Sequence, residues 1–423
     1  MLYSNYNLEI QVNDKIVLFN AVTNSYAIFL LEEFERMKKC PSAYLGSIQG
    51  TSAYSQFLNE GFFIRDEAQE WSLIKDNFYT KAYNSSVFNA TIIPTNSCNL
   101  ACSYCFAPRS SITMSNEVID MTIAYFEKVL SANEHNLKHF NVKWFGGEPL
   151  LHPRAINAIG LKLIEFCEVI ESHYHASIYT NLTILNDEII RVLREGGITE
   201  IFTTLDGVGN VNDSRRPAKD GRRYFSRLVE NIKRVSEISP VNILTNIDAS
   251  NKESVENLID FLVREDVVDG ERIKIGFNLI NDNEFILDKD KLLSYESNET
   301  VEMIDGYVER LRDRASYALP ADTISCLALA KNTIVVDPDG GLRKCPLGKQ
   351  VGSVFDSSLF TYNDSVLTGF DDIFTKSDCV SCKVFPLCYG GCSHEGQTIC
   401  IMKKLITTKI KRYFQNYLSM ERC

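Results

Sequence analysis

The sequence predicts an α/β protein with a parallel sheet at its centre, and two observations carry this prediction. Between Ser86 and Leu279, short apolar runs rich in β-branched residues alternate with longer amphipathic segments of helical period. Six strand-like runs separated by five helix-like segments are typical of repeated strand–helix units. Because a helical crossover leaves successive strands parallel, the pattern indicates either an open sheet or an incomplete barrel.

Each element of this central region has approximate bounds in the sequence. We expect strands at Val87–Pro94, Phe140–Phe145, Ala176–Thr180, Glu200–Leu205, Val241–Ile247 and Ile273–Leu279. We expect helices at Glu117–Leu130, Ala155–Ile170, Asn186–Glu195, Phe225–Val235 and Lys252–Arg264. The alternation stops after Ile280, and a further helix is expected at about Thr300–Ala315.

The first eighty residues have a different pattern from the central region. Residues 8–29 alternate apolar and polar side chains and contain two turn-like breaks, which predicts three short antiparallel strands. A helix is expected at about Leu30–Lys39, and a second short helix is expected to end near Gly61–Asp66. We therefore divide the chain into a small α+β module at 1–82, the strand–helix region at 83–300 and a tail domain at 301–423.

Composition excludes several classes of protein. With 45% hydrophobic and 23% charged residues, the 423-residue chain has the make-up of an ordinary globular protein. The first residues lack the basic start and apolar core of a signal peptide, and no run approaches the ~20 apolar residues of a membrane span. The net charge of −11 argues against nucleic acid as the main partner. We expect a cytoplasmic protein without a membrane partner.

Thirteen cysteines are many for a cytoplasmic protein, and most of them are clustered. Without a secretory signal, disulfides are not expected, and clustered thiols indicate ligands of a metal or an iron–sulfur cluster. Three cysteines lie within eight residues, at Cys98, Cys102 and Cys105. Seven more lie in the tail, at Cys326, Cys345, Cys379, Cys382, Cys388, Cys392 and Cys400. The isolated cysteines, expected to be ordinary thiols, are Cys40, Cys167 and Cys423.

Polar or glycine-rich segments follow four of the predicted strands. These segments are the cysteine loop that begins at Ser97, Gly146–Leu151, Thr180–Leu182 and Asp206–Asn210. The carboxyl ends of parallel strands meet at one edge of a sheet, and active sites of such folds gather there. We therefore expect the four segments to form one site.

The cysteine loop carries a family resemblance. Its C-x3-C-x2-C spacing suits three thiolates around an iron–sulfur cluster, whereas a structural zinc site generally has four ligands. With Tyr104 before the last cysteine and Gly146–Glu148 after the next strand, the region resembles the radical S-adenosylmethionine (SAM) superfamily. The resemblance implies a partial (β/α)6 barrel and a [4Fe–4S] cluster whose open iron binds SAM. One electron then cleaves SAM to a 5′-deoxyadenosyl radical.

The resemblance also implies individual SAM contacts. Gly146–Glu148 match a motif whose backbone and carboxylate meet the SAM ammonium, and Arg216 matches an arginine that pairs with the SAM carboxylate. Thr204 takes the place of a serine that contacts SAM, and Thr180–Asn181 resemble ribose contacts. Four of these residues also fit ordinary polar positions at the end of a sheet: Thr180, Asn181, Thr204 and Arg216. The expected SAM contacts are Tyr104, Gly146, Gly147, Glu148, Thr180, Asn181, Thr204 and Arg216.

The tail resembles the SPASM extension of radical SAM enzymes, which carries two auxiliary [4Fe–4S] clusters. The family pattern assigns auxiliary cluster I to Cys326, Cys345 and Cys392. It assigns auxiliary cluster II to Cys379, Cys382, Cys388 and Cys400. A zinc ribbon is the alternative, because C-x2-C pairs also bind zinc.

The tail departs from the anaerobic sulfatase-maturating enzymes in two ways. In those relatives an aspartate that acts as a base directly follows the second SPASM cysteine, whereas this chain has Pro346. They also have an additional cysteine that completes auxiliary cluster I, whereas only three ligands are counted here. Sulfatase maturation is therefore disfavoured. An open iron on auxiliary cluster I suggests that a substrate thiolate or another peptide group binds there.

These resemblances imply a SPASM-domain peptide maturase. The 5′-deoxyadenosyl radical abstracts hydrogen from a ribosomally synthesised precursor peptide, and a thioether, carbon–carbon or carbon–oxygen crosslink forms. The N-terminal module then fits a recognition element (RRE) that binds the leader of the precursor by strand addition. A flavodoxin or ferredoxin is the expected electron donor. The rival interpretations are oxidation of a protein Ser or Cys, as in sulfatase maturation, and a non-catalytic iron–sulfur electron carrier.

Overall fold

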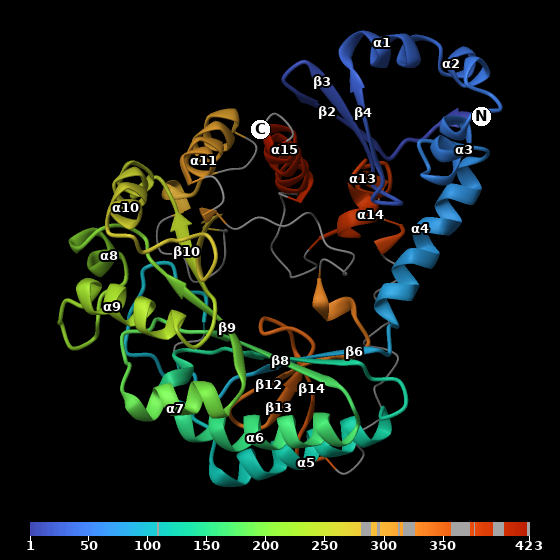
Figure 1. Cartoon of the computed structure of the whole chain (residues 1–423). Helices are drawn as coiled ribbons and strands as arrows, with labels where there is room; N and C mark the ends of the chain where they lie inside the picture. Colours follow the sequence, from blue (N-terminus) through green and yellow to red (C-terminus); the bar gives the residue numbers. More distant parts are fainter. Residues whose placement is uncertain are drawn as a thin grey trace. The chain divides into compact units, whose positions relative to one another are not determined.

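The computed structural model divides the chain into two compact units (Figure 1). The first unit comprises Met1–Tyr83, Tyr317–Ala330 and Leu367–Cys423, and the second comprises Asn84–Ser316 and Lys331–Val366. The described residues are 1–107, 110–280, 289–293, 297–311, 314–315, 326–356, 373–375, 377–391 and 402–420. In these residues no helix is long and apolar enough to cross a membrane. The cysteine-rich tail contributes residues to both units.

The second unit is built on a sheet whose parallel strands lie side by side in the order in which they occur in the chain. The sheet order is β11-β10-β9-β8-β7-β6, continued by β12, β13 and β14. Since the six strands from β6 to β11 follow one another in chain order without a reversal, they have the arrangement of an incomplete barrel and not of a doubly wound fold. The predicted α/β class is confirmed. The parallel strands are β6 (Val87–Ile92), β7 (His139–Trp144), β8 (His173–Tyr179), β9 (Ile198–Thr204), β10 (Val241–Ile247) and β11 (Ile273–Leu279).

Helices connect these strands as predicted. Figure 1 shows α5, α6 and α7 along one face of the sheet. Ser115 accepts a hydrogen bond from Val118 N (3.2 Å) at the start of α5, and Asn186 accepts one from Ile189 N (2.9 Å) at the start of α7. The helices of this unit are α5 (Asn116–Ala132), α6 (Pro153–Val169), α7 (Asp187–Glu195), α8 (Asn210–Arg215), α9 (Phe225–Ser236), α10 (Lys252–Arg264) and α11 (Asn298–Leu311), with short 3-10 turns η1 (Pro149–Leu151) and η2 (Lys289–Lys291).

Three tail strands extend the same sheet beyond β6. They are β12 (Thr333–Val336), β13 (Gly341–Arg343) and β14 (Gln350–Ser353). β12 pairs in parallel with β6, and β13 and β14 continue the sheet as antiparallel strands. This pairing, which the sequence did not predict, brings a tail segment beside the first strand of the barrel.

The first unit contains the three predicted N-terminal strands, β2 (Asn7–Val12), β3 (Lys15–Asn20) and β4 (Tyr26–Leu30), as an antiparallel sheet. β1 (Leu2–Tyr3) and β5 (Phe63–Ile64) form a separate two-stranded sheet, and Phe63 shares a core with Leu18 and Phe29 of the three-stranded sheet. The helices are α1 (Leu31–Lys39), α2 (Pro41–Ser47), α3 (Ser52–Asn59), α4 (Glu67–Ala82), α13 (Ser377–Val380), α14 (Phe385–Cys388) and α15 (Met402–Met420), with the turn η4 (Leu327–Leu329).

The helix predicted to end near Gly61–Asp66 is α3, which ends at Asn59, and Phe63–Ile64 in the segment after it form β5. The long helix α4 that follows was not predicted. Its buried positions form a narrow line that includes the charged Glu70 beside Ile74 and Phe78, so the helix shows little apolar periodicity.

Candidate active site

The cysteine loop leaves the carboxyl end of β6 and runs along the segment that follows α8. Ala101 N donates to Pro217 O (2.8 Å), and Ser103 N donates to Arg215 O (3.1 Å). An isolated bridge pairs Leu100 with Ala218. The loop that carries Cys98, Cys102 and Cys105 is therefore fastened by its backbone to the segment that carries Arg216.

Burial, with a smaller contribution from neighbouring thiols of the loop, raises the pKa of Cys98 and of Cys102. Burial raises the pKa of Cys102 to about 11, although Arg216 lowers it. Burial also raises the pKa of Cys98, whose sulfur accepts a hydrogen bond from Leu100 N (3.4 Å). Within the described ranges, no three Cys, His, Asp or Glu side chains are gathered closely enough to hold a single metal ion. Thiols with raised pKa values need a bound cation to become thiolates at neutral pH.

Gly146 and Gly147 lie directly against the start of the cysteine loop. A Cβ atom on Gly146 would lie 2.4 Å from Thr95 O, and one on Gly147 would lie 2.3 Å from Ser97 O. Gly147 N also donates to Thr95 O (3.0 Å), and Glu148 N donates to Ser97 O (2.8 Å). The close approach that requires glycine is therefore to the chain's own backbone, and it joins the ends of β6 and β7.

Glu148 connects this junction to the end of β8. Its buried carboxylate accepts hydrogen bonds from Leu150 N (3.0 Å), Thr180 Oγ1 (2.7 Å) and Asn181 N (2.7 Å). Burial raises the pKa of Glu148, and these donors counteract that increase. Because two carboxylate oxygens offer about four acceptor positions, the three bonds leave capacity for a ligand donor.

Asn181 reaches the cysteine loop directly. Its side-chain amide donates to Asn99 Oδ1 (2.9 Å) and to Cys98 Sγ (3.8 Å). Thr204 ends β9 opposite Leu244 of β10 and is half-buried. No contact described for Thr204 joins its side chain to the other expected SAM contacts, so its role stays a prediction.

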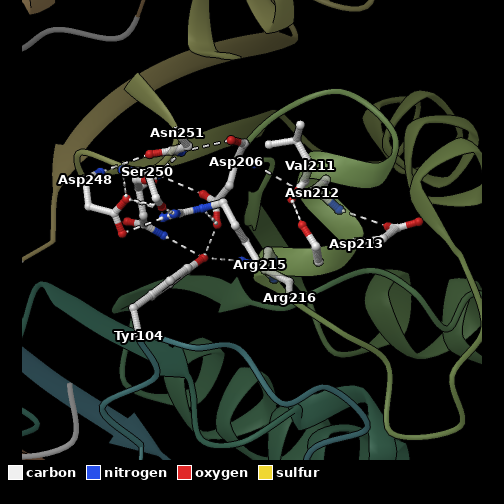
Figure 2. A network of polar contacts seen from close by, with 12 residues as sticks. Tyr104, Asp206, Val211, Asn212, Asp213, Arg215, Arg216, Asp248, Ser250 and Asn251 are labelled. Carbon is white, nitrogen blue, oxygen red and sulfur yellow. Dashed lines mark hydrogen bonds and ion pairs between the residues drawn. The ribbon is translucent and has the colours of Figure 1, made fainter. Parts of the chain in front are cut away.

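Tyr104 belongs to a buried polar network (Figure 2). Its hydroxyl donates to Asp206 Oδ2 and accepts from Arg216 Nη1 (3.1 Å) and Asn246 Nδ2 (3.3 Å). Burial and the neighbouring Asp206 raise the pKa of Tyr104 well above its usual value, which keeps the phenol protonated as a donor. The aromatic residue of the cysteine loop is thus anchored to the ends of β9 and β10.

Adjacent arginines have different partners in this network. Arg215 forms an ion pair with Asp248 (2.9 Å), donates to Asn246 O (3.3 Å) and lies over the ring of Tyr104, 5.5 Å from its centroid (Figure 2). Arg216 is 6% exposed, and its Nε has no hydrogen-bond partner among the residues that the structure describes. A buried, partly unpaired guanidinium is costly without a partner, so Arg216 is suited to an anionic ligand.

Sequence reasoning missed two residues of this network and gave a third no individual role. Asp206 was expected only as part of a strand-end segment of the site, and its buried carboxylate accepts from Tyr104 and from Asn246 N (2.9 Å). Arg215 and Asp248 were not assigned any role. The signal in the sequence was the adjacent pair Arg215 and Arg216. A single sequence does not show which distant aspartates such arginines contact.

The tail cysteines are described only in part. Cys379, Cys382 and Cys388 lie on or between α13 and α14, packed into the apolar core of the first unit. Cys326 belongs to the first unit and Cys345 to the second. Cys392 and Cys400 lie outside the described residues, so both auxiliary ligand sets stay predictions.

Comparisons with known proteins agree with the geometry of the loop. Residues 92–262 match the family described as "Radical SAM superfamily". The serine-type anaerobic sulfatase-maturating enzyme of Klebsiella aerogenes is 24% identical over 70% of this chain and 76% of its own length.

Two solved structures have a similar fold. "Native anSMEcpe with bound AdoMet" covers 79% of this chain and 98% of its own, with a TM-score of 0.57 and 19% identity. SuiB of Streptococcus suis bound to S-adenosylmethionine covers 93% of this chain and 95% of its own, with a TM-score of 0.52 and 15% identity.

The family implies SAM and one [4Fe–4S] cluster, and the residues fit both. Three thiols share one loop, and the buried Arg216 has an unpaired Nε beside them. Glu148 retains acceptor capacity at the neighbouring strand end. The family match lies on these strands, and residues 92–262 therefore form a radical SAM domain.

Proposed function

We propose that this enzyme modifies a ribosomally synthesised precursor peptide by installing an intramolecular crosslink. When bound, SAM and the cluster supply a 5′-deoxyadenosyl radical that abstracts hydrogen from an unactivated carbon. Cys98, Cys102 and Cys105 hold the cluster. Arg216 pairs with the SAM carboxylate, and Glu148 accepts from the SAM ammonium.

The observation that carries the proposal is the fastening of Arg216 to the cysteine loop. Ser103 N donates to Arg215 O, and Arg216 Nη1 donates to the Tyr104 hydroxyl. A buried guanidinium is thereby held beside the thiols by two separate contacts. This arrangement supports binding of an anionic cofactor group next to a cluster, which a simple electron carrier does not need.

The peptide substrate is supported by the extent of the structural likeness. SuiB, also solved bound to the precursor peptide SuiA, is similar over 92% of this chain. The likeness to anSMEcpe, also solved with the Kp18Cys peptide bound, covers about four fifths of the chain. Both likenesses support a peptide substrate.

In this proposal β4 is the strand to which the leader peptide adds. Asn20 N donates to Ser25 O (2.9 Å) and Leu31 N donates to Asp14 O (3.4 Å). Because hydrogen-bonded and non-hydrogen-bonded pairs alternate in an antiparallel sheet, the pair Lys15–Leu30 of β3 and β4 is a non-hydrogen-bonded one. The N–H of Leu30 consequently points away from β3, toward the free edge of the sheet. Leu30 is also 59% exposed.

Leu30→Pro tests this edge in the whole chain. Leu30 has φ −68°, which proline adopts without strain, so the substitution removes one outward donor and leaves the ladder intact. Loss of one hydrogen bond should weaken binding of a candidate precursor, encoded beside this gene, by roughly 2–10-fold in fluorescence anisotropy. Leu30→Ala, which keeps the donor, is the control. Equal affinity of both variants would exclude strand addition at this position.

The main experiment uses protein reconstituted with iron and sulfide without oxygen, then reduced and supplied with SAM. We expect 5′-deoxyadenosine, measured by liquid chromatography and mass spectrometry. Adding candidate precursor peptides should give a product lighter by two hydrogens, and its fragmentation should locate a crosslink between two residues. Absence of 5′-deoxyadenosine would contradict every catalytic interpretation.

Sulfatase-type oxidation of a Ser or Cys is the second candidate, favoured by the 24% identity to the Klebsiella aerogenes enzyme over 70% of the chain. It gives the same mass change from Ser, so fragmentation must decide between a formylglycine and a crosslink. This chain has Pro346 where the sulfatase-maturating enzymes have an aspartate that acts as a base, which argues for the crosslink.

Two auxiliary [4Fe–4S] clusters complete the proposal. Cys326, Cys345 and Cys392 would hold the first, and its open iron is available to a substrate group. Cys379, Cys382, Cys388 and Cys400 would hold the second. Iron and sulfide analysis of the reconstituted chain tests for three clusters, and a flavodoxin or ferredoxin is the proposed source of the electron.

A further inference from the structure

A cavity of about 230 Å³ lies beside the cysteine loop, within the second unit. One wall comes from the barrel and includes Phe106 and Phe145. The opposite wall comes from the segment 337–347, around the turn between β12 and β13 and the residues after it. Among the described residues that line the cavity, the charged ones are Asp337, Asp339 and Arg343, and all three belong to this second wall.

The barrel wall is aromatic and belongs to the SAM-binding region. Phe106 directly follows Cys105, and Phe145 directly precedes Gly146. Their rings are stacked, with centroids 5.9 Å apart and planes inclined by 22°. Such a surface accommodates an aliphatic chain and attracts a cation placed over a ring.

The charged wall has an excess of negative charge. Asp337 is buried and accepts a hydrogen bond from Arg343 Nε, whose guanidinium also donates to Gly348 O (3.1 Å). Asp339 is exposed and accepts from Gly341 N (3.0 Å). Two carboxylates facing one guanidinium leave a net charge of −1 on this wall.

The size of the cavity restricts its occupant. A cavity of roughly 150 Å³ holds benzene, whereas pockets for drug-sized ligands measure roughly 300–1,000 Å³. At about 230 Å³ the cavity has room for one large amino-acid side chain.

We propose that this cavity binds a lysine or arginine side chain of the substrate peptide. The inference rests on the proposed function, because it assigns a residue type to that peptide. The aliphatic stem lies against Phe106 and Phe145, and the cationic end faces Asp337 and Asp339. The site thereby holds one basic residue of the peptide beside the SAM-binding loop. This contact determines which part of the peptide lies next to the loop.

The test measures binding of three pentapeptides, Ac-Gly-Gly-Xaa-Gly-Gly-amide, to the whole chain without SAM or cluster. Xaa is lysine, norleucine or glutamate, and ligand-observed NMR at low salt reports the affinities. We expect the lysine peptide to bind about 3–10-fold more tightly than the norleucine peptide, and the glutamate peptide to bind least. High salt should reduce the advantage of lysine.

Variants of Asp339 locate the effect in the cavity; Asp339 is exposed, and Asp339→Asn keeps a side-chain oxygen that can accept from Gly341 N. Asp339→Asn should reduce the preference for lysine by about threefold. Asp339→Lys should reverse the preference between the lysine and glutamate peptides, a result that mere structural disturbance does not give. Asp356→Asn is the matched control, since Asp356 is exposed on the same tail segment and does not line the cavity.

Three results would overturn the proposal: equal or weaker binding of the lysine peptide relative to norleucine, tighter binding of glutamate, or an unchanged preference in Asp339→Lys. The experiment is independent of the proposed function. A chain that forms 5′-deoxyadenosine but shows no lysine preference refutes only the cavity assignment, whereas a chain that forms no 5′-deoxyadenosine refutes the catalytic proposal.

Discussion

The cysteine loop at Cys98–Cys105 and the tail cysteines at Cys379–Cys388 have similar spacings but opposite surroundings. Around the loop, the neighbouring side chains are polar and hydrogen-bonded, as with Asn181 and Arg216. Around the tail cysteines, the neighbours are aromatic. Trp71 stacks on Phe385 with centroids 5.8 Å apart, and both belong to the core that contains these cysteines.

This difference separates two uses of cysteine. Buried polar groups are costly unless they are paired, so the polar groups kept around the loop indicate an exchangeable polar ligand. The tail cysteines are packed into or against the apolar core of the first unit. Such surroundings suit a permanent group that stores or transfers electrons without binding a polar substrate.

The largest expected effect tests the loop. Cys102→Ser removes one of three thiolate ligands, and we expect 5′-deoxyadenosine formation to fall below detection because the cluster is no longer held. Cys40→Ser is the control, since Cys40 is exposed and isolated in the sequence. Persistent SAM cleavage by Cys102→Ser would show that the loop is not the cluster site.

The second prediction tests the tail cysteines. In the double variant Cys379→Ser/Cys382→Ser, SAM cleavage should continue, because the loop is unaffected, while peptide modification should be abolished for lack of an electron acceptor. The iron content per chain should also fall relative to Cys40→Ser. Zinc in place of iron in the unaltered chain would instead support the zinc-ribbon alternative.

The third prediction separates the two adjacent arginines of the loop region. Arg215→Gln leaves Asp248 buried without its cation and should destabilise the protein by about 3–5 kcal/mol in chemical unfolding. Arg216→Gln should weaken SAM binding by roughly tenfold or more, measured by calorimetry, and should also lower stability, because Arg216 is a cationic neighbour of the buried Asp206. Arg222→Gln, at an exposed position, should change neither quantity. Equal losses of SAM affinity in Arg215→Gln and Arg216→Gln would contradict the different roles assigned to the two arginines.

The smallest expected effect is a pH dependence from the same network. The hydrogen bonds from Arg215 and Ser250 hold the pKa of Asp248 below its usual value, although burial opposes this. The unfolded state therefore binds more protons in acid, so this contribution to stability is present at neutral pH and is lost as pH falls below about 4. Unfolding midpoints between pH 7 and pH 3 should fall less steeply in Asp248→Asn. If the unfolding midpoint depends on pH equally in both proteins, Asp248 does not contribute to the pH dependence of stability.

The accuracy of the sequence prediction differed between regions for physical reasons. β10 and β11 occur at their predicted bounds, because strands covered by helices appear as continuous apolar, β-branched runs. Helix α4 was missed because its buried line includes Glu70, which weakens the helical period. The pairing of β12 with β6 joins residues about 240 positions apart, and no local pattern encodes such a contact.

The sequence by itself determined the α/β class, the strand ends that carry chemistry and the spacing of the three loop cysteines, because all of these depend on local periodicity and motifs. Only the tertiary structure decided how the polar residues are partnered. It placed Tyr104 against Asp206 and Arg216, and it separated Arg215 from Arg216 by their partners. The physical reason is that hydrogen-bond partners are chosen by distance in space, and burial makes each unmet polar group expensive.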